Sequence, residues 1–157
     1  AFTIRYPKGK CSSYDINMAQ NLIELGQWEL LTKGSKVALL ATGSMVQPCI
    51  DIKDEISELV GCEVSVINSR FIKPIDKKMI DELIEDHEYF FTFEEGSLIG
   101  GFGSSVLQYI SQKNKGVKVF NKGIEDNFIE HGTRTELLKI AKLDTESLIN
   151  FIENNIL

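Results

Sequence analysis

Short apolar runs alternate with amphipathic segments along most of this chain. Residues 37–41 form a continuous apolar run, which is typical of a strand covered on both faces. The other predicted strands are residues 63–68, 89–93 and 117–120. Between them, apolar residues lie three and four positions apart, which predicts helices. Two more helices are expected near the end of the chain, at 134–141 and 145–155.

This alternation predicts the fold class. Strands that alternate with helices are joined by right-handed crossovers, which leave the strands parallel. We therefore expect an α/β fold in three layers: an open, mainly parallel sheet with helices on both faces. Side-chain oxygens just before the predicted helices are expected to cap them. The expected caps are Ser44, Asp76, Thr133 and Asp144.

The first 34 residues lack this regular pattern. Residues 1–6 alternate apolar and polar positions like a strand, but they begin without Met or a leading loop, so the chain is expected to be cut from a longer one. Residues 11–34 are irregular, and we interpret them as a linker that packs across a domain, with a short strand near Trp28.

Charge and apolar content exclude several classes of partner. The chain of 157 residues has 17 Lys and Arg against 23 Asp and Glu, a net charge of −6, and has no basic patch. Such a charge repels nucleic-acid phosphates and anionic membrane surfaces. No apolar run reaches the length of a membrane span, and no signal peptide is recognisable, so we expect a cytoplasmic protein that contacts neither nucleic acid nor membranes.

Cysteine and histidine are too few for a disulfide framework or an ordinary transition-metal site. The three cysteines are widely spaced, and the two histidines, His87 and His131, have no cysteines beside them. His87 stands between Asp86 and Glu88 and is expected to be a solvated residue at a helix end. For His131, a hydrogen bond that fixes the loop before the next helix is favoured over catalysis.

A glycine-rich loop and a carboxylate pair follow the third apolar strand. Residues 100–104 could hold an anion at a helix N-terminus, but they lack the third glycine of a dinucleotide fingerprint. A sharp turn with close helix packing is the favoured interpretation. Glu94 and Glu95 could act as acid and base, but neighbours on an extended backbone point to opposite faces, so we expect no shared site.

The arginines are informative because there are only three, at positions 5, 70 and 134. Arg70 follows the second apolar strand, at the edge where open α/β sheets bind ligands, and Arg5 lies in an extended segment. A guanidinium group binds phosphate through two parallel hydrogen bonds. Two converging arginines would therefore select a phosphorylated substrate, while surface ion pairs are an equal alternative on composition alone.

Four short motifs, in order, resemble 1-deoxy-D-xylulose-5-phosphate synthases. They are residues 4–9 (IRYPKG), residues 68–76 (NSRFIKPID), Glu94 and Glu95 with residues 100–104 (GGFGS), and residues 123–124 (GI) with residues 128–132 (FIEHG). Their order and spacing match the carboxyl-terminal part of this family along nearly the whole chain. The resemblance implies residues 1–34 as the end of a preceding pyrimidine-binding domain with a linker, and residues 35–157 as a transketolase C-terminal-like domain.

The resemblance also implies an activity for the full-length protein. Enzymes of this family are transferases that use thiamine diphosphate and Mg²⁺ to join pyruvate and glyceraldehyde 3-phosphate, with loss of CO₂, in isoprenoid and thiamine precursor synthesis. They are homodimers. Their magnesium motif, Gly-Asp-Gly, does not occur in this chain. We therefore expect the chain alone to be inactive and to bind neither cofactor nor metal.

The family pattern assigns roles to two arginines. Its phosphate-gripping arginines correspond to Arg5 and Arg70, whereas its catalytic groups lie upstream of this chain, so no catalytic residue is assigned to Glu94, Glu95 or His131. Lys8 stands where the family often has Arg and keeps the charge. The linker around Trp28 is expected to contact the missing domains. Two alternatives stay open: a non-catalytic module that binds a regulatory anion or nucleotide, and a subunit of a split transketolase-type enzyme.

Overall fold

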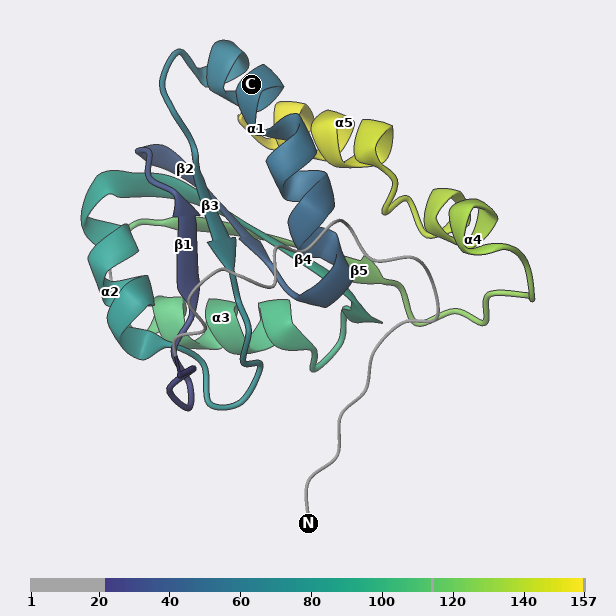
Figure 1. Ribbon diagram of the computed structural model, residues 1–157, viewed down its shortest axis with the longest axis horizontal. Helices are drawn as coiled ribbons and strands as arrows, with labels where there is room; N and C mark the ends of the chain where they lie inside the picture. The colour runs from purple at the N-terminus through teal and green to yellow at the C-terminus, as the bar shows by residue number, and fades with distance from the viewer. Residues whose placement is uncertain (1–21, 114, 157) are drawn as a thin grey trace.

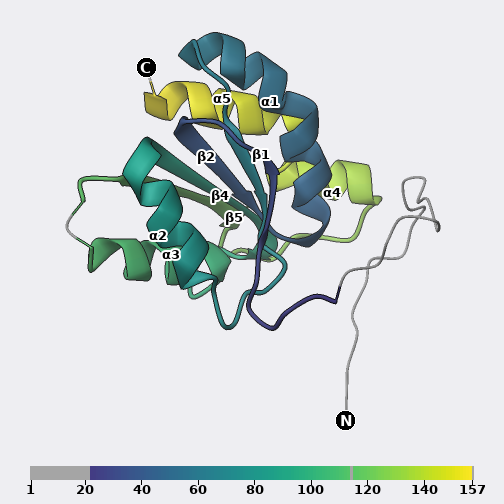
Figure 2. The same ribbon diagram turned by 60° about the vertical axis from the view of Figure 1, so that its left-hand side comes forward.

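The computed structural model describes residues 22–113 and 115–156, and it has a five-stranded sheet between two layers of helices (Figures 1 and 2). The strand order is β1-β3-β2-β4-β5. The strands are β1 (Glu29–Thr32), β2 (Lys36–Ala41), β3 (Ser65–Asn68), β4 (His87–Ser97) and β5 (Lys118–Ile124). All neighbouring pairs are parallel except β1 with β3, so the predicted open, mainly parallel sheet is confirmed.

Helices cover both faces of the sheet, as predicted. The helices are α1 (Val46–Val60), α2 (Lys77–Asp86), α3 (Phe102–Ser111), α4 (Arg134–Ile140) and α5 (Thr145–Ile156), and a 3₁₀ turn, η1 (Gly43–Met45), precedes α1. Figure 2 shows α1 and α5 on one face, and α2 and α3 on the other. No helix in residues 22–113 and 115–156 is long and apolar enough to cross a membrane.

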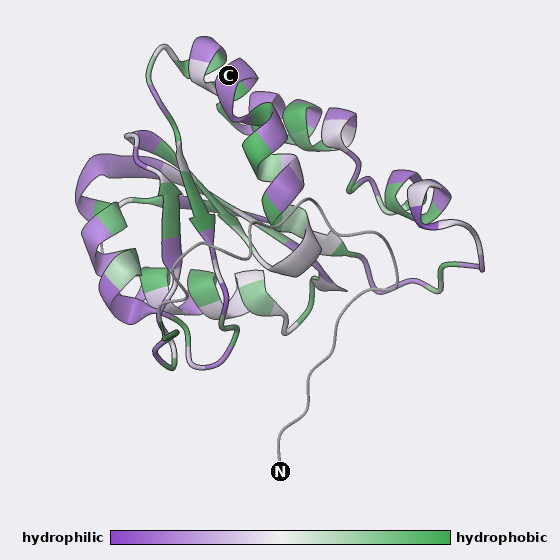
Figure 3. Ribbon diagram, viewed as in Figure 1, coloured by the Kyte–Doolittle hydropathy of each residue, from purple (hydrophilic) through white to green (hydrophobic). Residues whose placement is uncertain are grey.

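Each face of the sheet has its own apolar core, because successive residues of a strand point to opposite faces. Leu39 and Phe91 pack with α1 and α5, whereas their neighbours Leu40 and Phe90 pack with α2 and α3. All four side chains are fully buried. The central strands therefore carry hydrophobic residues on both sides, and α2 turns hydrophilic residues outward (Figure 3).

Two of the predicted helix caps are confirmed by hydrogen bonds. The Asp76 carboxylate accepts the N–H of Met79 at 3.0 Å and begins α2. Thr133 and Glu136 form a reciprocal capping box at the start of α4. The cap predicted at Ser44 is wrong, since Ser44 lies inside η1 and Met45 is the N-cap residue of α1.

The edge strand β1 extends the domain toward the amino end of the chain. The strand predicted near Trp28 is present, and it pairs with β3 through Glu29 opposite Asn68 and Leu30 opposite Ile67. Residues 29–32 therefore pair into this sheet. The segment assigned to a preceding domain lies mostly in residues 1–21, outside the described part.

Candidate functional site at the carboxyl edge of the sheet

The carboxyl ends of the four parallel strands meet at one edge of the sheet, where ligands of open α/β folds bind. Because β1 is antiparallel, its first residue, Glu29, lies at this same edge beside Asn68. Several polar residues of interest lie near this edge. Ser44 follows β2, Arg70 follows β3, and Glu94 and Glu95 lie in the last part of β4. This edge is the candidate functional site.

Arg70 is held at the edge by an acidic partner. Its Nη2 lies 2.5 Å from Oε2 of Glu29, and the side-chain amide of Asn68 donates to the same oxygen at 3.1 Å. The Arg70 side chain is 28% exposed, so it is partly accessible at this edge. Arg5 lies outside the described residues, and its convergence with Arg70 stays a prediction.

Hydrogen bonds from Trp28 connect the segment after Arg70 to the start of β1. Its indole Nε1 donates to the carbonyl of Phe71 at 2.8 Å, and its backbone N–H donates to Oδ2 of Asp76 at 2.8 Å. The ring is 3% exposed and meets Phe102 edge-on. Trp28 is thus a core residue of this domain, and its side chain is not exposed for contact with other domains.

The glycine-rich loop does not offer a free anion site, because the protein places its own carboxylate there. Glu94 is buried, and its two oxygens accept the backbone N–H groups of Phe102 and Gly103 at the start of α3, each at 2.9 Å. The favoured interpretation, a loop that permits close packing, is confirmed. A Cβ on Gly101 would lie 2.1 Å from the Ser97 carbonyl oxygen.

Glu95 points away from Glu94, as the alternation of a strand predicts, and pairs with Arg134. Both guanidinium Nη atoms bond its carboxylate. Partial burial raises the pKa of Glu95, but the bonds from Arg134 and Ser44 outweigh it, so the pKa lies below its usual value. The pair lies beside a pocket of about 480 Å³ with apolar walls, which include Ile124, Leu138 and Leu143.

His87 is buried rather than solvated, so that expectation is wrong. Its Nδ1 lies 2.8 Å from the Leu83 carbonyl oxygen, and its Nε2 lies 2.9 Å from Oγ of Ser65, which also accepts the N–H of Gly34. A neutral ring that donates from Nδ1 and accepts at Nε2 satisfies all three contacts. Burial lowers the pKa of His87, against the opposing effects of the Leu83 carbonyl and Asp86.

This buried histidine predicts a loss of stability in mild acid. Because the folded-state pKa is lowered, the unfolded chain binds more protons below about pH 6.5, the ordinary histidine value. We expect the free energy of unfolding to be constant above that pH and to fall as the pH drops toward 5. Urea unfolding at stepped pH measures this slope, and His87→Gln is expected to flatten it. An unchanged slope in this variant would contradict the assignment.

The remaining titratable candidates do not form a reactive cluster. His131 is exposed, and no hydrogen bond is present between its ring and the rest of the described chain, so the predicted loop-fixing bond is not found. Burial raises the pKa of the Cys49 thiol far above its usual range. Within residues 22–113 and 115–156, no group of three or more histidine, cysteine or acidic residues could hold a metal ion.

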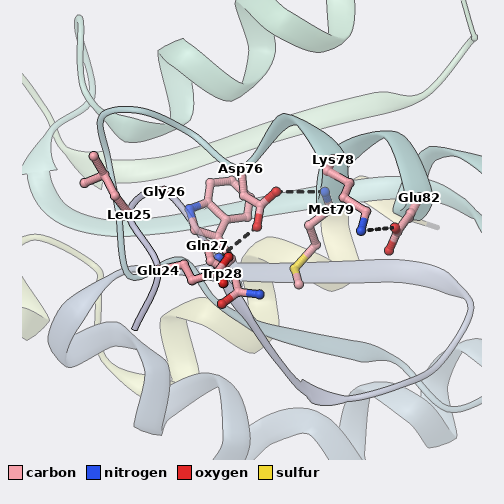
Figure 4. A pocket seen from close by; sticks show the side chains of 9 residues that line it. All are labelled: Glu24, Leu25, Gly26, Gln27, Trp28, Asp76, Lys78, Met79 and Glu82. Carbon is pink, nitrogen blue, oxygen red and sulfur yellow. Dashed lines mark hydrogen bonds and ion pairs between the residues drawn. The ribbon is translucent and has the colours of Figure 1, made fainter. Parts of the chain in front are cut away.

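A second hollow lies between the segment before β1 and α2, and its charge does not suit a phosphate (Figure 4). Its volume is about 370 Å³, and its wall includes Glu24, Asp76 and Glu82 against the single cation Lys78. Lys78 pairs with Glu82, while Asp76 is occupied by Trp28 and Met79. This acidic hollow would repel a phosphorylated ligand.

Comparison with known proteins identifies the class. The sequence model of the family described as transketolase, C-terminal domain, matches residues 26–148, and the chain belongs to this family. A solved split gene transketolase, described as an inactive beta4 tetramer, superposes with a TM-score of 0.76 at 27% identity over 84% of this chain and 43% of its own. Transketolase from Campylobacter jejuni shares the fold, with a TM-score of 0.52 at 22% identity over 81% of this chain and 18% of its own.

Curated relatives of similar sequence carry the name of one particular enzyme within this class. A 1-deoxy-D-xylulose-5-phosphate synthase from Clostridium tetani is 38% identical over 93% of this chain and 23% of its own length. The synthase of the same name from Natranaerobius thermophilus is 36% identical over 98% of this chain and 24% of its own length. The chain thus spans about a quarter of the length of the relatives that it matches.

Proposed function

We propose that this chain is the carboxyl-terminal domain of a 1-deoxy-D-xylulose-5-phosphate synthase. The whole enzyme would convert pyruvate and glyceraldehyde 3-phosphate to 1-deoxy-D-xylulose 5-phosphate and CO₂, for isoprenoid and thiamine precursor synthesis in the cytoplasm. The observation that carries the proposal is the similarity to synthases of this name over more than nine tenths of the chain. In this proposal the domain binds the acceptor phosphate through Arg5 and Arg70 and contributes to a homodimer.

The position of Arg70 supports this role. It stands at the ligand-binding edge, it is partly exposed, and its ion pair with Glu29 joins one guanidinium nitrogen to one carboxylate oxygen. A guanidinium group has five N–H donors, so its remaining donors suffice for two bonds to a phosphate. The ion pair with Glu29 neutralises part of the positive charge of Arg70. A doubly charged phosphate therefore needs a second cation, and Arg5 is the proposed one.

Thiamine diphosphate and Mg²⁺ do not fit the residues that the structure describes. The described residues lack a metal-binding cluster, and the helix terminus that could face a diphosphate is occupied by Glu94. The whole sequence also lacks Gly-Asp-Gly. We therefore assign the cofactor and its chemistry to parts of the enzyme beyond this chain, and we expect no turnover by the chain alone. Detectable product from the purified chain would contradict this.

A second candidate function is that of a separate subunit in a split transketolase-type enzyme. The observation in its favour is the structural similarity to a split gene transketolase. Activity that appears when the chain is mixed with a separately encoded polypeptide would support this alternative. The other alternative, a regulatory anion-binding module, has less support because Glu94 occupies the loop that would serve it.

The test of the phosphate role uses the intact enzyme. We expect Arg5→Ala and Arg70→Ala each to raise the KM for glyceraldehyde 3-phosphate at least tenfold, about 1.4 kcal/mol, while the KM for pyruvate stays unchanged. Lys115→Ala is the matched control, because it removes a positive charge beyond α3, at the opposite edge of the sheet. If neither KM changes, the two arginines are structural and the domain serves assembly.

A further inference from the structure

The contacts around Arg70 suggest a role for its acidic neighbour. Glu29 begins β1 and lies opposite Asn68 in the antiparallel pair of β1 and β3. Its Oε2 accepts a hydrogen bond from the side-chain amide of Asn68 and forms an ion pair with Nη2 of Arg70. Asn68, the last residue of β3, therefore holds the Glu29 carboxylate in place. The carboxylate in turn holds the guanidinium group of Arg70, which follows β3.

The backbone on both sides of this pair is also fixed. Trp28 precedes Glu29, and its indole N–H donates to the carbonyl of Phe71, which follows Arg70. The Trp28 backbone is bonded in turn to the Asp76 carboxylate that caps α2. Hydrogen bonds thus connect β1, the segment after β3 and the start of α2 beside Arg70.

Among residues 22–113 and 115–156, Glu29 is the ion-pair partner of Arg70, and it contacts the guanidinium group at Nη2. The salt bridge joins Nη2 to one carboxylate oxygen, in contrast to Arg134, both of whose Nη atoms bond Glu95. A flexible arginine loses rotamer entropy when it binds an anion, and a partner that already restrains the side chain reduces that loss. An ion pair through one oxygen of Glu29 therefore restrains the Arg70 side chain and does not engage both of its Nη atoms, which suits an arginine that must also bind a ligand.

We propose that Glu29 is a positioning residue, which orients Arg70 toward the phosphate of the acceptor substrate. This inference rests on the proposed function, since it takes Arg70 as a phosphate ligand. Glu29 itself does not touch the phosphate, and two negative groups would repel each other. Its contribution is to hold the guanidinium group so that the free donors face the substrate.

The test compares two substitutions at Glu29 in the intact enzyme. Glu29→Ala removes the acceptor oxygen, and we expect a three- to tenfold rise in the KM for glyceraldehyde 3-phosphate, with kcat and the KM for pyruvate within twofold. Glu29→Gln keeps an acceptor oxygen, and its KM is expected to stay within twofold of wild type. Unphosphorylated glyceraldehyde, used as acceptor, is expected to show no difference among these proteins.

Two further variants make the result specific. Glu88→Ala removes an exposed carboxylate near the other end of β4 and is expected to change neither KM. In the double variant Glu29→Ala with Arg70→Ala, the KM for glyceraldehyde 3-phosphate is expected to equal that of Arg70→Ala alone, because Glu29 acts through Arg70.

Contrary outcomes separate the two proposals. A lower KM in both Glu29 variants would mean that Glu29 competes with the phosphate, and an equal effect on unphosphorylated glyceraldehyde would mean a general structural role; either result overturns the positioning inference. If Arg70→Ala raises the KM but Glu29→Ala does not, only the positioning inference fails. If Arg70→Ala has no effect, the phosphate role of Arg70 fails, and the role of Glu29 fails with it.

Discussion

Replacement of Glu94 by alanine is expected to lower the free energy of unfolding by about 3–5 kcal/mol, the range for loss of buried, charge-assisted hydrogen bonds. The carboxylate is 4% exposed and bonds the first two N–H groups of α3. Alanine would leave both groups buried without an acceptor, and it would remove a negative charge from the positive end of the helix. Urea unfolding of the chain and of the variant measures the difference.

The neighbouring carboxylate provides the matched control. Glu95→Ala removes a carboxylate whose side chain is 28% exposed and whose partner Arg134 is 48% exposed, so we expect a loss of at most about 1 kcal/mol. Glu94→Gln is expected to lie between the wild type and Glu94→Ala, because an amide has one acceptor oxygen instead of two. Similar losses in Glu94→Ala and Glu95→Ala would show that the α3 cap contributes little.

The second large effect is expected at Gly103, where alanine should destabilise the chain by about 1–3 kcal/mol, as overpacked cores do. A Cβ there would lie 2.4 Å from Oγ1 of Thr92 and 2.7 Å from Cγ of Asn121, two residues that are hydrogen-bonded to each other. The expected loss of stability is opposite to the usual effect of this substitution, because alanine in place of glycine in an uncrowded helix stabilises by about 0.5–1 kcal/mol.

A double-mutant cycle tests this packing. Thr92→Ala removes the nearest atom, so Gly103→Ala should cost less in that background than in the wild type. Gly61→Ala is the comparison for backbone conformation alone, because Gly61 has a φ of 75° and a Cβ at this position would meet nothing within 4 Å. If Gly103→Ala instead stabilises the chain, the close approach of α3 to the sheet does not require glycine at position 103.

Local patterns determined most of the fold that could be predicted. The apolar run at residues 37–41 and the amphipathic spacing of the helices indicated the correct layers, because both periodicities depend on nearby residues only. Asp76 and Thr133 were identified as caps for the same reason, since a cap bonds a backbone group three positions away. The strand expected at residues 117–120 continues to Ile124, because β4 also runs on to Ser97 and pairs with it through Phe93 opposite Lys122 and Ser97 opposite Ile124.

The candidate site depended on partners that are distant in sequence. The glycine-rich loop and the Glu94 carboxylate carry no sequence signal that connects them, yet β4 and the turn after it bring them together. His87 was expected to be solvated because its sequence neighbours are charged, whereas its ring bonds Ser65, 22 residues earlier. Arg134 and Glu95 are 39 residues apart. Such pairs are set by the crossover packing of helices on the sheet, which no local pattern encodes.

The direction of β1 has a consequence for how this domain is tethered. A parallel edge strand would begin at the amino edge of the sheet and would bring the preceding polypeptide in on the side opposite Arg70. Because β1 is antiparallel, the chain enters beside Asn68 and Arg70. Reversal of one short strand thus determines that the polypeptide joins this sheet at the ligand-binding rim and not at the opposite rim.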